Sequence, residues 1–125
     1  MIRLLLPLPP STNDLYERAL GFTKRGKPYR ATRLKPKVEA YRWLVVQAVN
    51  QQLTPEERKT VPPQMSITVY LLDGATKMDA DNCLKSVIDA VKCPLGFDDN
   101  LKRVRRVTAE YVPVGPPCVV VIEEV

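Results

Sequence analysis

The chain has 125 residues, of which 26% are charged and 45% apolar, and its 19 Lys and Arg against 14 Asp and Glu give a formal net charge of +5. It contains no histidine, which excludes Ser-His-Asp and Cys-His nucleophile systems, His-ligated zinc and a histidine general base near neutral pH. Any catalysis must therefore use carboxylates, lysines, hydroxyls and a metal ion.

The length predicts one domain, residues 1–125, with a single hydrophobic core. No apolar run approaches the roughly 20 residues that a membrane span needs, and the first residues lack the cleavage site of a secretory signal. The three cysteines are odd in number and form no CxxC pair, so neither a disulfide framework nor a thiolate zinc site is indicated. We therefore expect a cytoplasmic protein with reduced cysteines and no membrane partner.

The pattern in the N-terminal part of the chain predicts a strand, a basic segment and a helix. Residues 2–6 are a short apolar run that ends at a proline-rich turn. Residues 21–32 alternate loosely around Arg25-Gly26, which leaves a basic hairpin and a loop as alternatives. Apolar residues then recur at spacings of three and four over residues 36–53, which predicts an amphipathic helix.

The C-terminal part predicts alternating strands and helices. After a proline-rich loop with one helical turn, the pattern indicates a strand, a helix, a turn region and two more strands. Their ranges are 65–72 for the strand, 81–91 for the helix, 93–99 for the turn region, and 102–112 and 118–123 for the last strands. We expect an α+β fold in which two main helices pack on a mixed β-sheet.

The charge is unevenly distributed along the chain. The net charge is +7 over residues 1–42, −3 over residues 43–99 and +1 over residues 100–125, and six of the seven aspartates lie between positions 73 and 99. A basic surround for an acidic centre suits a polyanion bound at a metal. The same distribution would arise if the basic residues only keep the protein soluble and the aspartates lie in loops without a shared role.

The segment Asp79-Ala80-Asp81-Asn82 lies at the predicted turn into a helix, where carboxylates two residues apart can converge on one point. Oxygen ligands of this kind suit Mg²⁺ or Mn²⁺. Lys85 follows Asp81 by four residues and shares its helix face, where it can contact a phosphate. Taken alone, the same residues also fit a helix cap and a surface ion pair.

Three segments together resemble the RusA family of Holliday junction resolvases, small endonucleases of DNA recombination and repair that are often encoded by prophages. Leu6 to Asn13 resembles the family's strand and PPS-x-N turn, Asp79 to Lys85 resembles its DxDNxxK signature, and Asp98-Asp99 with Val104 resembles its DD-x-x-V block, although four residues separate Asp99 from Val104 here. The order and spacing of the three blocks are more specific than any one of them.

The resemblance implies a Mg²⁺-dependent homodimer, with Mn²⁺ as a substitute ion and no nucleotide cofactor, that cuts four-way junction DNA symmetrically. Asp79, Asp81 and Asp99 would be the metal ligands, and Lys85 the catalytic or phosphate-contacting lysine. Asp99 can join the other two only if the chain doubles back along a helix about 16 Å long.

The resemblance also places DNA contacts on the turn from Ser11 to Asp14 and on the segment before and within the acidic motif. Relatives can carry a run of arginines before DxDN, whereas this chain has only one basic residue there. Other basic segments are therefore expected to supply phosphate contacts. The expected DNA-binding residues are Ser11, Thr12, Asn13, Asp14, Lys77, Asn82, Lys85, Lys24, Arg25, Lys27, Lys102 and Arg103.

Several alternatives remain open from the sequence. The same nuclease could act on flaps, nicks or forks, the chain could be a non-catalytic DNA-binding protein, or it could be a plain α+β interaction domain. Trp43 fits a core or dimer contact better than base stacking, and Asp89 fits a solvated or capping residue better than a metal ligand.

Overall fold

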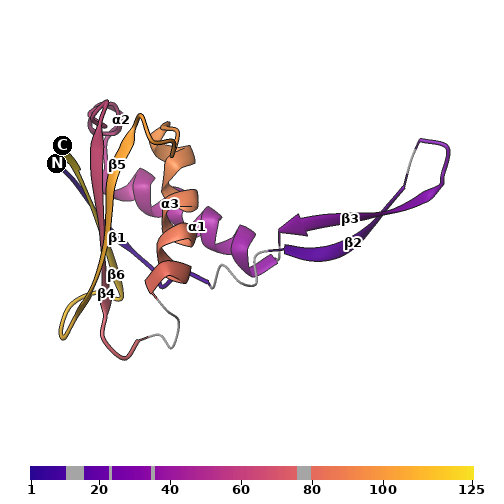
Figure 1. The fold of residues 1–125 in the computed structure, drawn as a ribbon, viewed down its shortest axis with the longest axis horizontal. Coiled ribbons are helices and arrows are strands. Elements are labelled where there is room, and N and C mark those ends of the chain that lie inside the picture. The colour runs from indigo at the N-terminus through magenta and orange to yellow at the C-terminus, as the bar shows by residue number, and fades with distance from the viewer. Residues whose placement is uncertain (11–15, 23, 35, 76–79) are drawn as a thin grey trace.

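The computed structural model describes residues 1–10, 16–22, 24–34, 36–75 and 80–125, and it confirms an α+β fold with a mixed sheet and two main helices (Figure 1). The predicted order of elements is also confirmed. The elements are β1 (Ile2–Leu6), β2 (Tyr16–Phe22), β3 (Pro28–Leu34), α1 (Pro36–Gln52), α2 (Pro55–Arg58), β4 (Met65–Leu72), α3 (Ala80–Leu95), β5 (Val104–Val112) and β6 (Cys118–Glu124).

The main sheet has the strand order β1-β6-β4-β5. β4 pairs antiparallel with β6 and parallel with β5, so β5 and β6 follow each other in sequence but lie on either side of β4. A parallel pair needs a crossover connection, and α3 provides the one between β4 and β5. Figure 1 shows α1 and α3 together on one side of this sheet.

The core lies between the sheet and these two helices. Alternate residues of β4 point into it, because side chains of a strand alternate between the two faces. Met65, Ile67, Val69 and Leu71 are all fully buried, as the sequence pattern predicts. The helices contribute residues at spacings of three and four, which are Val38, Tyr41, Val45 and Val49 of α1, and Cys83, Val87, Ala90 and Val91 of α3.

Helix α3 extends one turn further than the sequence predicts. The predicted end near Val91 is wrong, because Pro94 lies inside the last turn and the helix continues to Leu95. Gly96 then adopts a φ of +69°, and the amides of Gly96 and Phe97 donate to the carbonyls of Cys93 and Lys92 at 3.1 Å each. This is a Schellman end, which satisfies the last helical carbonyls. The buried Phe97 anchors the chain that leads to Asp99.

Residues 16–34 include a two-stranded hairpin, which decides between the two alternatives that the sequence left open. β2 and β3 pair antiparallel from Tyr16 opposite Leu34 to Phe22 opposite Pro28. Gly26 lies in the connecting turn with a φ of +79°, a conformation that favours glycine. Figure 1 shows this hairpin projecting away from the sheet and the helices.

Within the described residues, no helix is long and apolar enough to cross a membrane. The cysteines are free thiols, as expected, with Cys83 and Cys118 buried and Cys93 exposed. Burial, and to a lesser extent the nearby Cys83 thiol, raises the pKa of Cys118 to about 12.

Candidate active site

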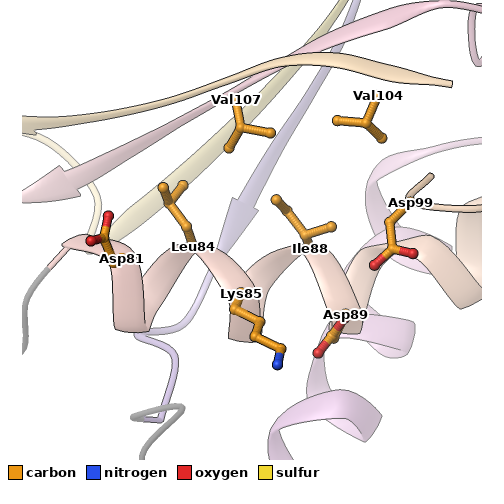
Figure 2. A pocket seen from close by; sticks show the side chains of 8 residues that line it. All are labelled: Asp81, Leu84, Lys85, Ile88, Asp89, Asp99, Val104 and Val107. Carbon is orange, nitrogen blue, oxygen red and sulfur yellow. The ribbon is translucent and has the colours of Figure 1, made fainter. Parts of the chain in front are cut away.

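A pocket of about 300 Å³ lies between α3 and the edge strand β5. It carries the acidic and lysine residues of the sequence motif together with apolar side chains of both elements (Figure 2). Its lining consists of Asp81, Leu84, Lys85, Ile88, Asp89, Asp99, Val104 and Val107.

The pocket residues of α3 follow from helical spacing. Asp81, Lys85 and Asp89 recur every four residues and therefore fall on one side of the helix. Leu84 and Ile88 lie between them and point toward β5 in Figure 2. The pocket thus combines charged side chains at its margin with an apolar surface in its middle.

Asp81 and Asp99 face the same pocket from opposite ends (Figure 2). Asp81 lies in the first turn of α3, whereas Asp99 follows the Schellman end of that helix. Asp89, which lies between Asp81 and Asp99 in the sequence, is already about 12 Å from Asp81 along the helix axis. Among the described residues there is accordingly no group of three Cys, Asp or Glu that could hold a metal. Asp79 lies outside the described residues, so the three-carboxylate metal site stays a prediction.

Ion pairs connect the far end of the pocket to α1. The Lys92 ammonium lies 3.6 Å from a carboxylate oxygen of Asp89 and 3.5 Å from one of Asp99. The Arg42 guanidinium lies 3.9 Å from the other Asp89 oxygen. The side chain of Asp89 is only 16% exposed. These contacts hold Asp99 at the C-terminal end of α3 in this structure.

Two parts of the pocket were not predicted from the sequence, namely Asp89 and the apolar surface that includes Leu84 and Ile88. The expectation that Asp89 is a solvated or capping residue is wrong, because its side chain is mostly buried and lines the pocket. The sequence pattern that could have identified Asp89 is its spacing of four residues from Lys85, which continues the interval between Asp81 and Lys85 on one helix face. The apolar residues Leu84 and Ile88 lie in the helix predicted over residues 81–91, a prediction that does not place them in a pocket.

Part of the predicted DNA-binding set lies outside the described residues, namely Ser11 to Asp14 and Lys77. The residue just before that turn is nevertheless fixed on α3, because the Ser86 hydroxyl donates to the Pro10 carbonyl at 2.7 Å. Asn82 lies in the first turn of α3, next to Asp81. The structure therefore brings Pro10, the residue before the predicted turn, alongside the helix that carries Asp81 and Lys85.

The other predicted DNA-binding residues are separated in space. Lys24, Arg25 and Lys27 are exposed around the hairpin turn, and Lys102 is exposed just before β5. The Arg103 side chain is less accessible and donates to the Pro62 carbonyl at 3.4 Å, so it supports the fold locally. Trp43 is 62% exposed on α1, so it is not a core residue of this chain, and the other expectation, a dimer contact, stays a prediction.

The fold and the pocket define a small α+β protein with a basic, projecting hairpin and a pocket that carries carboxylates and a lysine, a class that suits work on a polyanion. The family model of endodeoxyribonuclease RusA matches residues 7–123. The chain therefore belongs to the RusA endodeoxyribonuclease family, as its three sequence motifs indicate. A comparison with curated proteins gave no match.

Proposed function

We propose that this chain is a Mg²⁺-dependent endodeoxyribonuclease that resolves four-way DNA junctions by phosphodiester hydrolysis. The match to the nuclease family over residues 7–123 carries this proposal. The pocket supports it, because Asp81 and Lys85 of the family's motif both line it.

The donor set near the start of α3 fits a hard divalent ion. The carboxylate of Asp81 lies on an exposed residue at the pocket margin, and oxygen ligands with free space for water suit Mg²⁺ or Mn²⁺. Asp79 and Asp81 would hold the ion. Asp99, the third ligand that the family resemblance implies, lies at the opposite end of the pocket in this structure. When bound, the ion polarises phosphate oxygens and activates water.

The chain's own groups near this point favour a phosphate. The first amides of α3, from Ala80 onward, form the positive end of the helix dipole, which attracts anions. Lys85 lies one turn further along, exposed and lining the same pocket. Its ammonium would contact the scissile phosphate and offset the negative charge that grows on the leaving oxygen.

A homodimer is part of the proposal. A four-way junction has two strands to cut, and a two-fold axis between two copies of this chain would present two equivalent pockets. Cleavage at these two equivalent pockets would therefore be symmetric. No nucleotide cofactor is needed, because hydrolysis uses water as the nucleophile.

A cleavage assay tests the substrate. Purified protein is incubated in Mg²⁺ with a mobile four-way junction, a linear duplex of the same sequence and a 5′ flap, each end-labelled. We expect paired cuts on opposed strands of the junction and at least about tenfold slower cutting of the other two. Faster cutting of the flap would contradict junction resolution while keeping the nuclease.

A further inference from the structure

The β2–β3 hairpin, residues 16–22 and 28–34, is the most isolated part of the described fold. Its strands pair with each other over seven residues each, and Figure 1 shows them leaving the body near the start of α1. A single two-stranded hairpin is marginally stable in water on its own. Contact with a surface outside its own chain would stabilise such a hairpin.

The chemistry of the hairpin turn indicates what that surface is. Residues 24–28, with the sequence Lys-Arg-Gly-Lys-Pro, are all exposed, and this segment contains three basic residues and no acidic one. The two strands add three arginines against one glutamate. Such a composition favours a polyanion over an apolar protein surface.

The shape of the hairpin fits a DNA groove, because the major groove of B-DNA admits a two-stranded β-ribbon. We propose that the β2–β3 hairpin inserts into the groove of a duplex arm of the substrate, with Lys24 and Arg25 on its phosphates. This proposal rests on the proposed action on branched DNA. It adds a second, remote DNA site to the pocket at α3.

The length of the hairpin sets where this contact falls. Seven residues of strand at about 3.3 Å each span roughly 20 Å, which corresponds to about six base pairs at 3.4 Å per step. The turn would therefore reach phosphates several base pairs away from the point where the pocket cuts. Binding should then depend on the length of the DNA arms.

A matched pair of double variants tests the contact. Lys24→Ala with Arg25→Ala removes one lysine and one arginine from the turn. Arg3→Ala with Lys59→Ala removes the same charges from exposed positions on β1 and after α2. Equal melting temperatures would show that all proteins are folded. Affinity for a four-way junction is measured by fluorescence anisotropy over a range of salt, without Mg²⁺.

We expect the turn variant to bind the junction at least about tenfold more weakly than the wild type. The slope of log K against log salt should also become shallower by about two, because each lost phosphate contact removes about 0.9. The control variant should stay within about threefold of the wild type. Equal affinities of the two variants would overturn the proposal.

Arm length provides a second test. Junctions with arms of about 20 base pairs are compared with junctions whose arms of about 4 base pairs are closed by loops, too short for the roughly 20 Å reach. The wild type should prefer the long arms, and the turn variant should bind both equally weakly. A preference for long arms that the variant keeps in full would contradict the proposal.

Three further outcomes distinguish this proposal from the alternatives and from the proposed nuclease activity. Sedimentation of the turn variant as a smaller species than the wild type would show that the hairpin binds another protein chain, which contradicts the proposal. If the wild type binds long-armed junctions through the turn but cuts no DNA, the remote contact stands and the proposed nuclease activity fails. If it cuts junctions while the turn variant binds normally, the remote contact alone fails.

Discussion

At the scale of residues, the helix that carries Asp81 shows what spacing can and cannot predict. The four-residue interval between Asp81 and Lys85 places both on one helix face, and the structure brings both to one pocket. The same interval leads to Asp89, yet an acidic residue on a helix is usually solvated, so the sequence alone gave no reason to choose it. Its burial depends on packing against α1, where Arg42 is a tertiary partner, while Lys92 lies only three residues further along the same helix.

Lys85 provides a residue-scale prediction for catalysis. Lys85→Met keeps the length of the side chain but removes the charge, so junction cleavage should slow by about 10²-fold or more, as when one preorganised electrostatic group is lost. Junction affinity should fall only by the effect of one phosphate contact. Single-turnover cleavage separates the two effects.

The matched control for this prediction is Lys59→Met, which removes the same charge from an exposed position outside the pocket. The control should cut at the wild-type rate. An equal rate loss in both variants would mean that net charge, and not the position of Lys85, limits cleavage.

The buried thiol of Cys118 provides a prediction on pH. Its pKa is about 12 in the folded chain against an ordinary value of 9.0, mainly because of burial. The folded state therefore holds this proton more tightly than the unfolded state. The stability that this provides is fully present below about pH 9 and is lost as pH rises toward 12.

Urea unfolding of the wild type and of Cys118→Ala, followed from pH 7 to 11, isolates this group. The difference in unfolding free energy between the two proteins should be constant up to about pH 9 and should shrink above it. A difference that grows above pH 9 would show that the sign is wrong.

At the scale of elements, the end of α3 shows how capping overrides a helix breaker. Pro94 predicts an earlier end, because proline removes an amide donor and crowds the preceding turn. The structure places it in the last turn, where Gly96 and Phe97 close the helix. The sequence contains this Pro-x-Gly pattern, but only the contacts of Phe97 with the core show that the extra turn is stable.

Gly96 allows this helix end to be tested. Gly96→Ala places a Cβ on a residue with a φ of +69°, which should cost about 1–2 kcal/mol of unfolding free energy. Urea unfolding measures this loss. Gly96→Asn is the control, since asparagine tolerates this conformation better and should cost less. A larger loss for asparagine than for alanine would argue against the left-handed cap.

At the scale of the whole molecule, the class of fold and most strands were predictable, whereas the strand order was not. Apolar periodicity predicts each element locally, but several sheets satisfy the same list of strands. The difference in burial between the last two strands carries the missing information: Cys118 to Ile122 are all buried in the central strand β6, while most of the edge strand β5 is exposed. A continuous apolar run is typical of a strand covered on both faces.

The core between sheet and helices can be tested on one strand. Ile67 of β4 is fully buried, and Thr68 beside it lies on the other face and is only half-buried. Ile67→Ala should lower the unfolding free energy by about 2–5 kcal/mol, and Thr68→Ala should change it by less than about 1 kcal/mol. Similar losses in urea unfolding would contradict the assignment of the two faces.

The candidate site was predicted in part. Local spacing predicted Asp81 and Lys85 because both lie on one helix. It could not place Asp99, because that position depends on how the chain leaves α3 and on Lys92. The predicted approach of Asp99 to Asp81 is not made within the described residues, where the two face the pocket from opposite ends.

The most direct test of the proposed nuclease is Asp81→Asn, assayed for both binding and cleavage of a four-way junction in Mg²⁺. Asp73→Asn, an exposed aspartate outside the pocket, is the matched control. We predict that Asp81→Asn binds the junction with wild-type affinity and cuts it at least about 10²-fold more slowly, while the control cuts normally. Full cleavage by Asp81→Asn would contradict the assignment of this pocket as the catalytic site.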